Sequence, residues 1–307
     1  MLQNEIIKPQ VSLAANGKSF YWASHFLSPN VAYNAASLYA FCRLLDDMAD
    51  GDIADGPARL NNIHTSLRLG QPSDDPALAS VQPLISEMGF STAVLLELLE
   101  GLLQDQEDQV CLSTEAEMLR YAYRVAGTVG LLMCTVLNSK DPEAYAFAID
   151  LGIGMQLTNI ARDVLEDARM GRRYIPADWV NGLSPNAICL ASADPEGKDA
   201  MLINAALERL LLLADKFYKS GTHGFTFLPL RAHIGIAIAA RIYRQIGVQL
   251  KASGYAWHES RQVTSKSTKL IHSLFALGSL ASRLPIFQKR RHDRSLHNLL
   301  QGLPYVK

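Results

Sequence analysis

Residues 39–50 read YAFCRLLDDMAD, and residues 152–176 read GIGMQLTNIARDVLEDARMGRRYIP. Both stretches have the composition of helices, and both place several carboxylates among apolar residues. A buried carboxylate is costly unless a cation or hydrogen-bond donors neutralise it. We therefore predict that the two acidic faces meet in the folded chain and share divalent cations. This requires two helices of one bundle to face each other across a common space.

In the first stretch, helical periodicity puts four polar side chains on one narrow stripe: Tyr39, Arg43, Asp46 and Asp50. Asp47 falls on the flank. Acids at a helix C-terminus oppose the helix dipole, and two carboxylates about 6 Å apart repel by roughly 3 kcal/mol at an effective dielectric constant near 20. A hard cation such as Mg²⁺ would relieve both costs, so we predict Asp46 and Asp50 as metal ligands, with Arg43 beside a phosphate. A solvent-exposed acidic helix end is the alternative.

The second stretch carries a polar line through an otherwise apolar helix, made of Gln156, Asn159, Asp163 and Asp167. Surface helices usually mix charges of both signs, so a line of amides and acids indicates a second platform for metal and diphosphate. A hydrogen-bonded seam between helices is the alternative. Phosphate can also be neutralised by the nearby arginines Arg162, Arg172 and Arg173.

Helix start and stop signals recur along the whole chain. Ser28-Pro29 begins a helix that runs to about Asp50, and Thr114 with Glu117 forms a capping box. Asp141-Pro142 begins a long helix that continues to about Gly171. Further helices are expected at 200–219, 229–253 and 266–284, with irregular stretches at 70–76, 172–199 and 219–228. We predict an all-α fold, a single domain over residues 1–307 with helices around a central cavity.

Bulk properties narrow the functional classes. The 307 residues are 49% hydrophobic and 19% charged, an apolar excess that suits a cavity lined with hydrocarbon. The net charge of −1 gives no electrostatic case for nucleic acid. Four cysteines without a CxxC pair predict reduced core thiols in an intracellular protein. We find no signal-peptide pattern and no apolar stretch long enough to span a membrane, so we expect a cytoplasmic protein.

Five blocks of the sequence resemble the squalene/phytoene synthase family. They are GKSFYWASHFL (17–27), YAFCRLLDDMAD (39–50), YAYRVAGTVGLLM (121–133), MQLTNIARDVLEDARMGRRYIP (155–176) and ARIYRQIGVQLKASGYAWHESRQVTSKSTKL (240–270). Their order and approximate spacing agree with the family, and they are spread over most of the chain. The resemblance implies an isoprenoid synthase fold. It also implies head-to-head condensation of two isoprenyl diphosphates through a cyclopropylcarbinyl diphosphate.

Residue by residue, the resemblance implies three sets of site residues. The metal ligands would be Asp46, Asp50, Asn159, Asp163 and Asp167. Substrate contacts would come from Ser19, Phe20, Tyr39, Arg43, Gln156, Asn159, Arg162, Tyr174, Tyr243 and Arg261, with Lys266 or Lys269 as further candidates. Tyr121 would lie near the reacting carbons and act with the four aspartates in catalysis.

Each assignment has a structural alternative. Ser19 can be a helix cap, Tyr121 a packed core tyrosine, and Arg261 an ordinary surface residue. The small residues of VAGTVG (125–130) can serve close helix packing, which is compatible with shaping a tunnel wall. Carbocations must be kept from water, so aromatic residues are expected in the wall of the cavity. The candidates are Phe20, Tyr21, Trp22, Phe26 and Phe41.

Within the family, the third and fourth blocks look most like bacterial phytoene synthases. This implies two geranylgeranyl diphosphates as substrates, Mg²⁺ (with Mn²⁺ possible) as the cofactor, and no need for NADPH. The main alternative is a farnesyl diphosphate enzyme that makes squalene, presqualene diphosphate or dehydrosqualene. A non-catalytic helical assembly factor and a terpene cyclase or chain-elongating synthase are kept as further alternatives.

The substrates and products of such an enzyme partition into bilayers, so we expect peripheral membrane contact. The basic stretch FQKRRHDR (287–294) beside apolar SLFALGSLASRLPIF (273–287) is a candidate contact, with a solvated tail as the alternative. The sequence does not indicate an oligomeric state.

Overall fold

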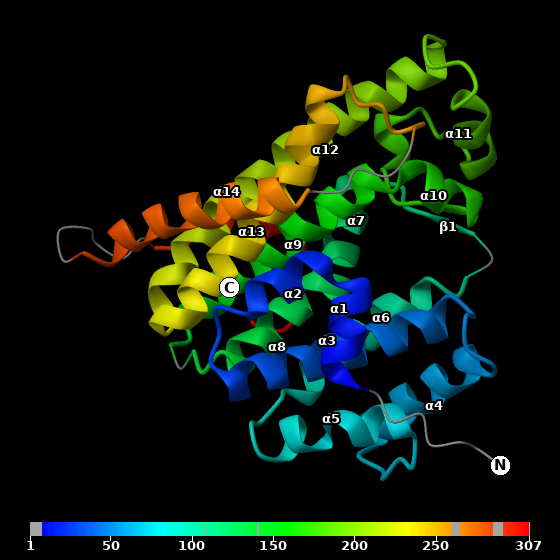
Figure 1. The fold of residues 1–307 in the computed structure, drawn as a ribbon. Helices are drawn as coiled ribbons and strands as arrows, with labels where there is room; N and C mark the ends of the chain where they lie inside the picture. Colours follow the sequence, from blue (N-terminus) through cyan, green and yellow to red (C-terminus); the bar gives the residue numbers. More distant parts are fainter. Residues whose placement is uncertain (1–7, 108, 140, 260–264, 285–290, 307) are drawn as a thin grey trace.

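The computed structural model describes residues 8–107, 109–139, 141–259, 265–284 and 291–306. The chain forms a bundle of α-helices (Figure 1). These are α1 (Pro9–Asn16), α2 (Lys18–Ser24), α3 (Pro29–Ala49), α4 (Gly56–Leu69), α5 (Pro76–Ser86), α6 (Thr92–Gln104), α7 (Glu115–Ala122), α8 (Thr128–Val136), α9 (Ala144–Arg162), α10 (Val164–Arg169), α11 (Pro185–Ala191), α12 (Lys198–His223), α13 (Leu230–Ala252) and α14 (Lys266–Leu277).

Shorter elements join the α-helices. A π-helical turn, η1 (Tyr123–Gly127), links α7 to α8. The 3-10 segments are η2 (Ala177–Trp179), η3 (Gly224–Phe227), η4 (Gly278–Arg283) and η5 (Arg294–Leu300). Two strands of two residues each, β1 (Val110–Cys111) and β2 (Arg172–Arg173), pair in parallel.

Helix α9 is the centre of the bundle and packs against α8, α12 and α13. It buries residues around its whole circumference, as a helix does when neighbours enclose it. Glycines allow the closest of these contacts. A side chain at Gly152 would collide with the carbonyl oxygen of Ala126, and one at Gly130 with that of Ala148. The small residues of 125–130 therefore serve close helix packing, as the sequence suggested.

Several predicted helix starts are confirmed. Helix α3 begins at Pro29 after Ser28, and Gly51, with φ of +79°, follows its end. The Thr114 hydroxyl accepts a hydrogen bond from the Glu117 backbone, and the Glu117 carboxylate accepts one from the Ser113 backbone. The predicted helix at 229–253 is α13, and the one at 200–219 extends to Lys198–His223.

Four predicted boundaries were wrong. The stretch 219–228, predicted as irregular, is helical to Phe227, through the end of α12 and η3. The long helix expected from 142 to 171 is divided at Asp163, whose backbone (φ −103°, ψ 13°) is not helical. The stretch 172–199, predicted as irregular, contains β2, η2 and the Ser184-capped α11. The helix expected at 266–284 is α-helical only to Leu277 and then tightens into η4.

None of the helices in the described part of the chain has the length and apolar content that crossing a bilayer requires. The four cysteines are unpaired, as predicted. Cys134 is buried, but Cys111 is exposed on the short β1 strand, so the prediction of a core position was wrong for it.

Candidate active site

The first acidic stretch lies on the last turns of α3. Arg43 donates a hydrogen bond to Asp46 over 3.0 Å and pairs with Asp47. About 45% of the Asp46 side chain is accessible, and the rest lies against protein atoms. This burial, together with the neighbouring Asp50, raises the pKa of Asp46 to about 6. The site therefore holds more acid than the local arginine neutralises, which favours a cation.

The second acidic stretch spans the joint between α9 and α10. The backbone amides of Asp163 and Asp167 bond to the carbonyls of Asn159 and Asp163, so these three residues remain on one line despite the break. Arg162 donates two hydrogen bonds, of 2.7 and 2.5 Å, to the Asp163 carboxylate. Burial, and then the charge of Asp163, raise the pKa of Asp167 well above its ordinary value. A carboxylate in this environment is stabilised by a bound cation.

Arg172 joins the two acidic stretches. From β2 it donates a hydrogen bond of 2.7 Å to Asp50 on α3 and one of 2.9 Å to the backbone oxygen of Asp105. Its positive charge lowers the pKa of Asp167, whereas burial raises it. The faces predicted from sequence to meet therefore lie within electrostatic reach of one guanidinium group.

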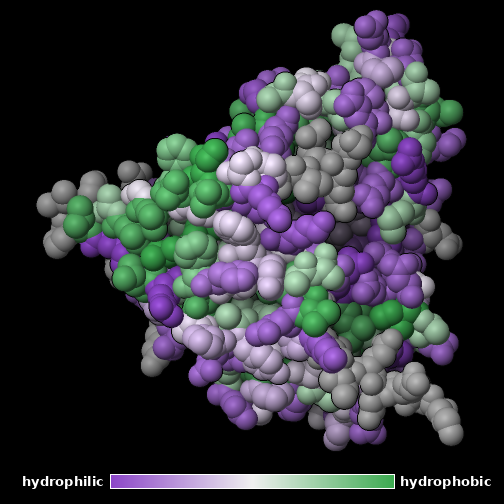
Figure 2. All heavy atoms as spheres, in the orientation of Figure 1, coloured by the Kyte–Doolittle hydropathy of each residue, from purple (hydrophilic) through white to green (hydrophobic). Residues whose placement is uncertain are grey.

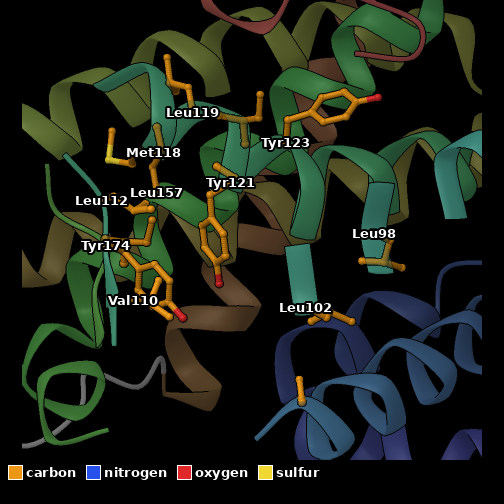
Figure 3. Close-up of a cluster of buried hydrophobic side chains, with 14 of the residues drawn as sticks. Leu98, Leu102, Val110, Leu112, Met118, Leu119, Tyr121, Tyr123, Leu157 and Tyr174 are labelled. Atoms are coloured by element: carbon orange, nitrogen blue, oxygen red, sulfur yellow. The ribbon is translucent and has the colours of Figure 1, made fainter. Parts of the chain in front are cut away.

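Asp105 is a residue that sequence reasoning missed. It follows the last residue of α6, is 7% exposed, and accepts hydrogen bonds from Tyr121 (2.8 Å) and Tyr174 (2.6 Å). The two rings stack with centroids 4.6 Å apart, and Figure 3 shows their hydroxyl groups directed to the same side. Asp105 also acts electrostatically on Asp46 and Asp167. Asp105 was not considered as a site residue, because it lies in neither acidic stretch, although Glu107 and Asp108 follow it closely in the sequence.

An apolar cavity opens beside the acidic residues. The space between its lining atoms, including the open mouth, is about 1060 Å³. Its polar lining residues include Gln156, Asn159 and Tyr243, linked by hydrogen bonds from Tyr243 to Asn159 (3.0 Å) and from Asn159 to Gln156 (3.2 Å). The polar line of α9 thus leads from the acidic site into the cavity.

The wall of the cavity is mainly aliphatic and small. Among the described residues it includes Val129, Met133, Leu137, Leu151, Met155, Leu228 and Ile236. Phe20 is the one aromatic candidate from the sequence that lines it, stacked on Tyr243 at 5.2 Å and near Tyr39 at 6.2 Å.

The other predicted wall aromatics lie elsewhere. Tyr21 and Phe26 are exposed, and Phe41 is packed in the core. Trp22 donates a hydrogen bond to Ser273 of α14. Tyr21 and Trp22 share α2 with Phe20 but lie on other faces of that helix, whereas Phe26 and Phe41 lie outside α2.

Of four further candidate site residues, three lie in the described part of the chain. Ser19 is half-buried on α2, and Lys269 donates a hydrogen bond to the adjacent Lys18 carbonyl over 3.2 Å. Arg173 is buried and bonds to the Leu112 and Ile175 carbonyls, so it supports the β1–β2 contact and is not placed to neutralise phosphate. Arg261 lies outside the described residues.

The carboxylates of the two acidic stretches are the type of donor that Mg²⁺ prefers. Asp46, Asp50, Asp163 and Asp167, with the amide of Asn159, offer hard oxygen atoms. Burial, and then a neighbouring carboxylate, raises the pKa of Asp46 and of Asp167, and a bound cation would oppose this rise. Mg²⁺ prefers such carboxylates and retains waters for bridging to phosphate.

A separate group of possible metal ligands lies at the C-terminal end of the chain. Asp150 of α9 is fully buried and accepts hydrogen bonds of 2.8 Å from His292 and His297. The three ligand atoms lie within 4.8 Å of one another. Since the histidines already satisfy both carboxylate oxygens, we interpret this group as a clamp that holds the C-terminal segment to α9.

Comparisons with known proteins show which family the chain resembles. Residues 13–268 match the family model described as squalene/phytoene synthase. A phytoene synthase from Pseudescherichia vulneris is 34% identical over 298 residues, covering 91% of this chain and 94% of the relative. A 15-cis-phytoene synthase from Pantoea ananas is 34% identical, covering 89% and 91%.

Solved structures give the same result for the fold. A dehydrosqualene synthase in complex with a ligand aligns with a TM-score of 0.78 and 27% identity, covering 89% of this chain and 95% of that chain. The squalene synthase HpnC from Alicyclobacillus acidocaldarius aligns with a TM-score of 0.68 at 21% identity, covering 80% and 93%, and supports the fold alone. The predicted all-helical isoprenoid synthase fold is confirmed, and the chain belongs to the squalene/phytoene synthase family.

Proposed function

We propose that this chain is a prenyltransferase that joins two geranylgeranyl diphosphates head to head and releases phytoene. The observation that carries the proposal is that Arg172 links both acidic stretches, while the polar line of α9 continues from the second stretch to the lining of an apolar cavity. Relatives named phytoene synthase match it over nearly their full length. In each half-reaction one diphosphate leaves and one proton is lost, so no reductant is needed.

The site residues would have different roles according to their chemistry. Mg²⁺, or Mn²⁺ in its place, would be held by Asp46, Asp50, Asn159, Asp163 and Asp167. When bound, it would neutralise the leaving diphosphate. Without substrate, Arg43, Arg162 and Arg172 each bond to an acid of these stretches. We expect them to turn toward the diphosphate when cations occupy the acids, because bidentate guanidinium contacts suit phosphate.

Two tyrosines would act nearer the reacting carbons. Tyr121 and Tyr174 share Asp105 as their hydrogen-bond acceptor, which fixes the position of both hydroxyl groups. The first carbons of the prenyl chain would be placed by Tyr243, Gln156 and Phe20, which line the cavity. The aliphatic wall would exclude water from the cationic intermediates.

The test is incubation of the purified chain with Mg²⁺ and either geranylgeranyl or farnesyl diphosphate, each with and without NADPH. We expect phytoene from geranylgeranyl diphosphate, no response to NADPH, and two diphosphates released per product. Use of farnesyl diphosphate alone would favour the second candidate, a dehydrosqualene or squalene-type enzyme, which the likeness to a dehydrosqualene synthase structure supports. One diphosphate per product would indicate cyclisation instead.

We also propose that the enzyme works in the cytoplasm in peripheral contact with a membrane. The support is chemical, since its substrates and product carry long hydrocarbon chains. Half of the basic stretch 287–294 lies outside the described residues, and this proposal does not rest on it.

A further inference from the structure

Helix α14 faces the protein with its polar side. Lys269 and Ser273 are each 7% exposed. Lys269 donates a hydrogen bond to the Lys18 carbonyl, and Ser273 accepts one of 2.9 Å from the Trp22 indole. A surface helix of a globular protein normally shows the reverse arrangement. The apolar side of α14 therefore faces outward, where it requires an apolar partner outside the protein.

That outward face is a continuous apolar stripe at helical spacing. Its exposed members are Leu270, Ile271, Leu274, Phe275 and Leu277, with Leu274 and Phe275 more than 60% accessible. Exposed Leu230 and Leu284 lie at the start of α13 and just after η4, the elements that pack next to α14. Figure 2 shows hydrophobic residues gathered over this part of the molecule, at the left of the view. We call these seven residues the α14 patch. Exposed patches of this kind mark interaction sites.

The charged residues of α13, α14 and η4 are all basic. The sequence has no Asp or Glu in 265–284 or in 230–252. Exposed cations border the patch at Lys266, Arg283, Arg231 and Arg241. An apolar helix face with a basic border is the arrangement that binds anionic lipid surfaces.

We propose that the α14 patch docks on an anionic phospholipid bilayer, with its side chains among the acyl chains and the bordering cations at the headgroups. The proposal rests on the peripheral membrane contact proposed above and names the element that makes it. A second copy of the chain fits less well. A two-fold dimer would place identical patches together and bring both basic borders into contact.

The α14 patch lies close to the apolar cavity. Leu228 and Ile236 line the cavity, and they belong to the segment on which α14 and η4 pack. Arg283 donates a hydrogen bond of 2.8 Å to the Leu228 carbonyl. Docking would therefore hold the apolar cavity one helix away from the bilayer that stores its hydrocarbon substrates.

The test uses the full chain and unilamellar vesicles, in flotation assays. The double variant Leu274→Ser, Phe275→Ser is compared with a control double variant, Leu190→Ser, Met201→Ser, which changes equally exposed residues on α11 and α12. We expect the α14 variant to lose binding to phosphatidylcholine–phosphatidylglycerol vesicles by on the order of tenfold or more, and the control to bind like wild type. Pure phosphatidylcholine vesicles should bind wild type more weakly. Equal binding by both variants would overturn the proposal.

A second variant reports insertion directly. Phe275→Trp places an indole on the exposed face, and its emission should shift to shorter wavelength when vesicles are added. No shift would contradict the proposal. A dimer in light scattering that the α14 double variant abolishes, without vesicle binding by wild type, would assign the patch to a second copy instead.

Turnover in detergent micelles separates this inference from the proposed function. There the α14 variant should release diphosphate at the wild-type rate. A wild-type protein that turns over but does not bind vesicles would refute the docking alone, whereas vesicle binding without turnover would refute the proposed function.

Discussion

Replacing Asp105 by Asn is expected to stabilise the metal-free protein and slow the enzyme. Burial raises the pKa of Asp105 to about 6 from an ordinary 3.8, even though Tyr174 and Tyr121 donate hydrogen bonds to it. The residue is 7% exposed, so solvent screens little of this effect. At 1.36 kcal/mol per pKa unit, the ionised carboxylate costs the fold about 3 kcal/mol relative to its protonated form. Asn resembles the protonated form at every pH.

The sign of the pH dependence follows from the raised pKa. The folded state binds the Asp105 proton more tightly than the unfolded chain, so the stability it contributes is present below pH 3.8 and is lost as pH rises through about 6. The variant should therefore exceed wild type by up to about 3 kcal/mol at pH 8, roughly 5 °C in Tm for a chain of this length. Near pH 4 the difference should become small.

The same Asp105→Asn substitution should lower the activity. An amide has one acceptor oxygen, so its NH₂ group must face one of the two tyrosine hydroxyls that Asp105 now accepts from. The displaced tyrosine and the lost charge should lower kcat by on the order of tenfold or more. This opposition between stability and activity is typical of residues retained for function.

The assay is thermal unfolding in EDTA at pH 8 and pH 4.5, followed by turnover in Mg²⁺. Asp74→Asn is the matched control, because Asp74 is exposed and the change in net charge is the same. The reasoning fails if Asp105→Asn is no more stable than this control at pH 8. Wild-type turnover by Asp105→Asn would remove Asp105 from the site.

Four other outcomes are expected. Asp46→Asn and Asp163→Asn should each abolish diphosphate release while circular dichroism stays that of the folded protein; product formation by either variant would contradict its role as a metal ligand. EDTA should stop turnover, and Mg²⁺ or Mn²⁺ should restore it; activity that survives chelation would argue against a metal-assisted mechanism. Gly152→Ala should lower stability by about 1–3 kcal/mol in urea unfolding, because its Cβ would strike the Ala126 carbonyl; an unchanged midpoint would show that the helices can separate. Hydrogen bonds from both histidines hold the pKa of Asp150 low against its burial, so the stability it contributes is present above about pH 4 and lost below it; Asp150→Asn should flatten the acid limb of the stability curve, and an unaltered limb would refute the clamp.

The sequence by itself determined the features that depend on local spacing. The cap at Ser28-Pro29 and a helical period near 3.6 placed Arg43, Asp46 and Asp50 together on α3. The same period aligned Gln156 with Asn159 along α9, where the structure shows them hydrogen-bonded. These relations join residues within one or two turns of a helix, so they do not depend on the tertiary structure. The catalytic and metal-binding roles of these residues stay predictions.

The tertiary structure alone decided the partners that lie far apart in the chain. Arg172 bonds to Asp50 across 122 positions, and Tyr174 to Asp105 across 69. Whether Arg172 faced phosphate or an acid, and whether Asp105 was buried, depended on how α3, α6 and β2 come together in the fold. The polar face of α14 was likewise assigned by its packing against α2. Sequence spacing determines which side chains share a face of a helix. The packing of the helices determines which residues that face contacts.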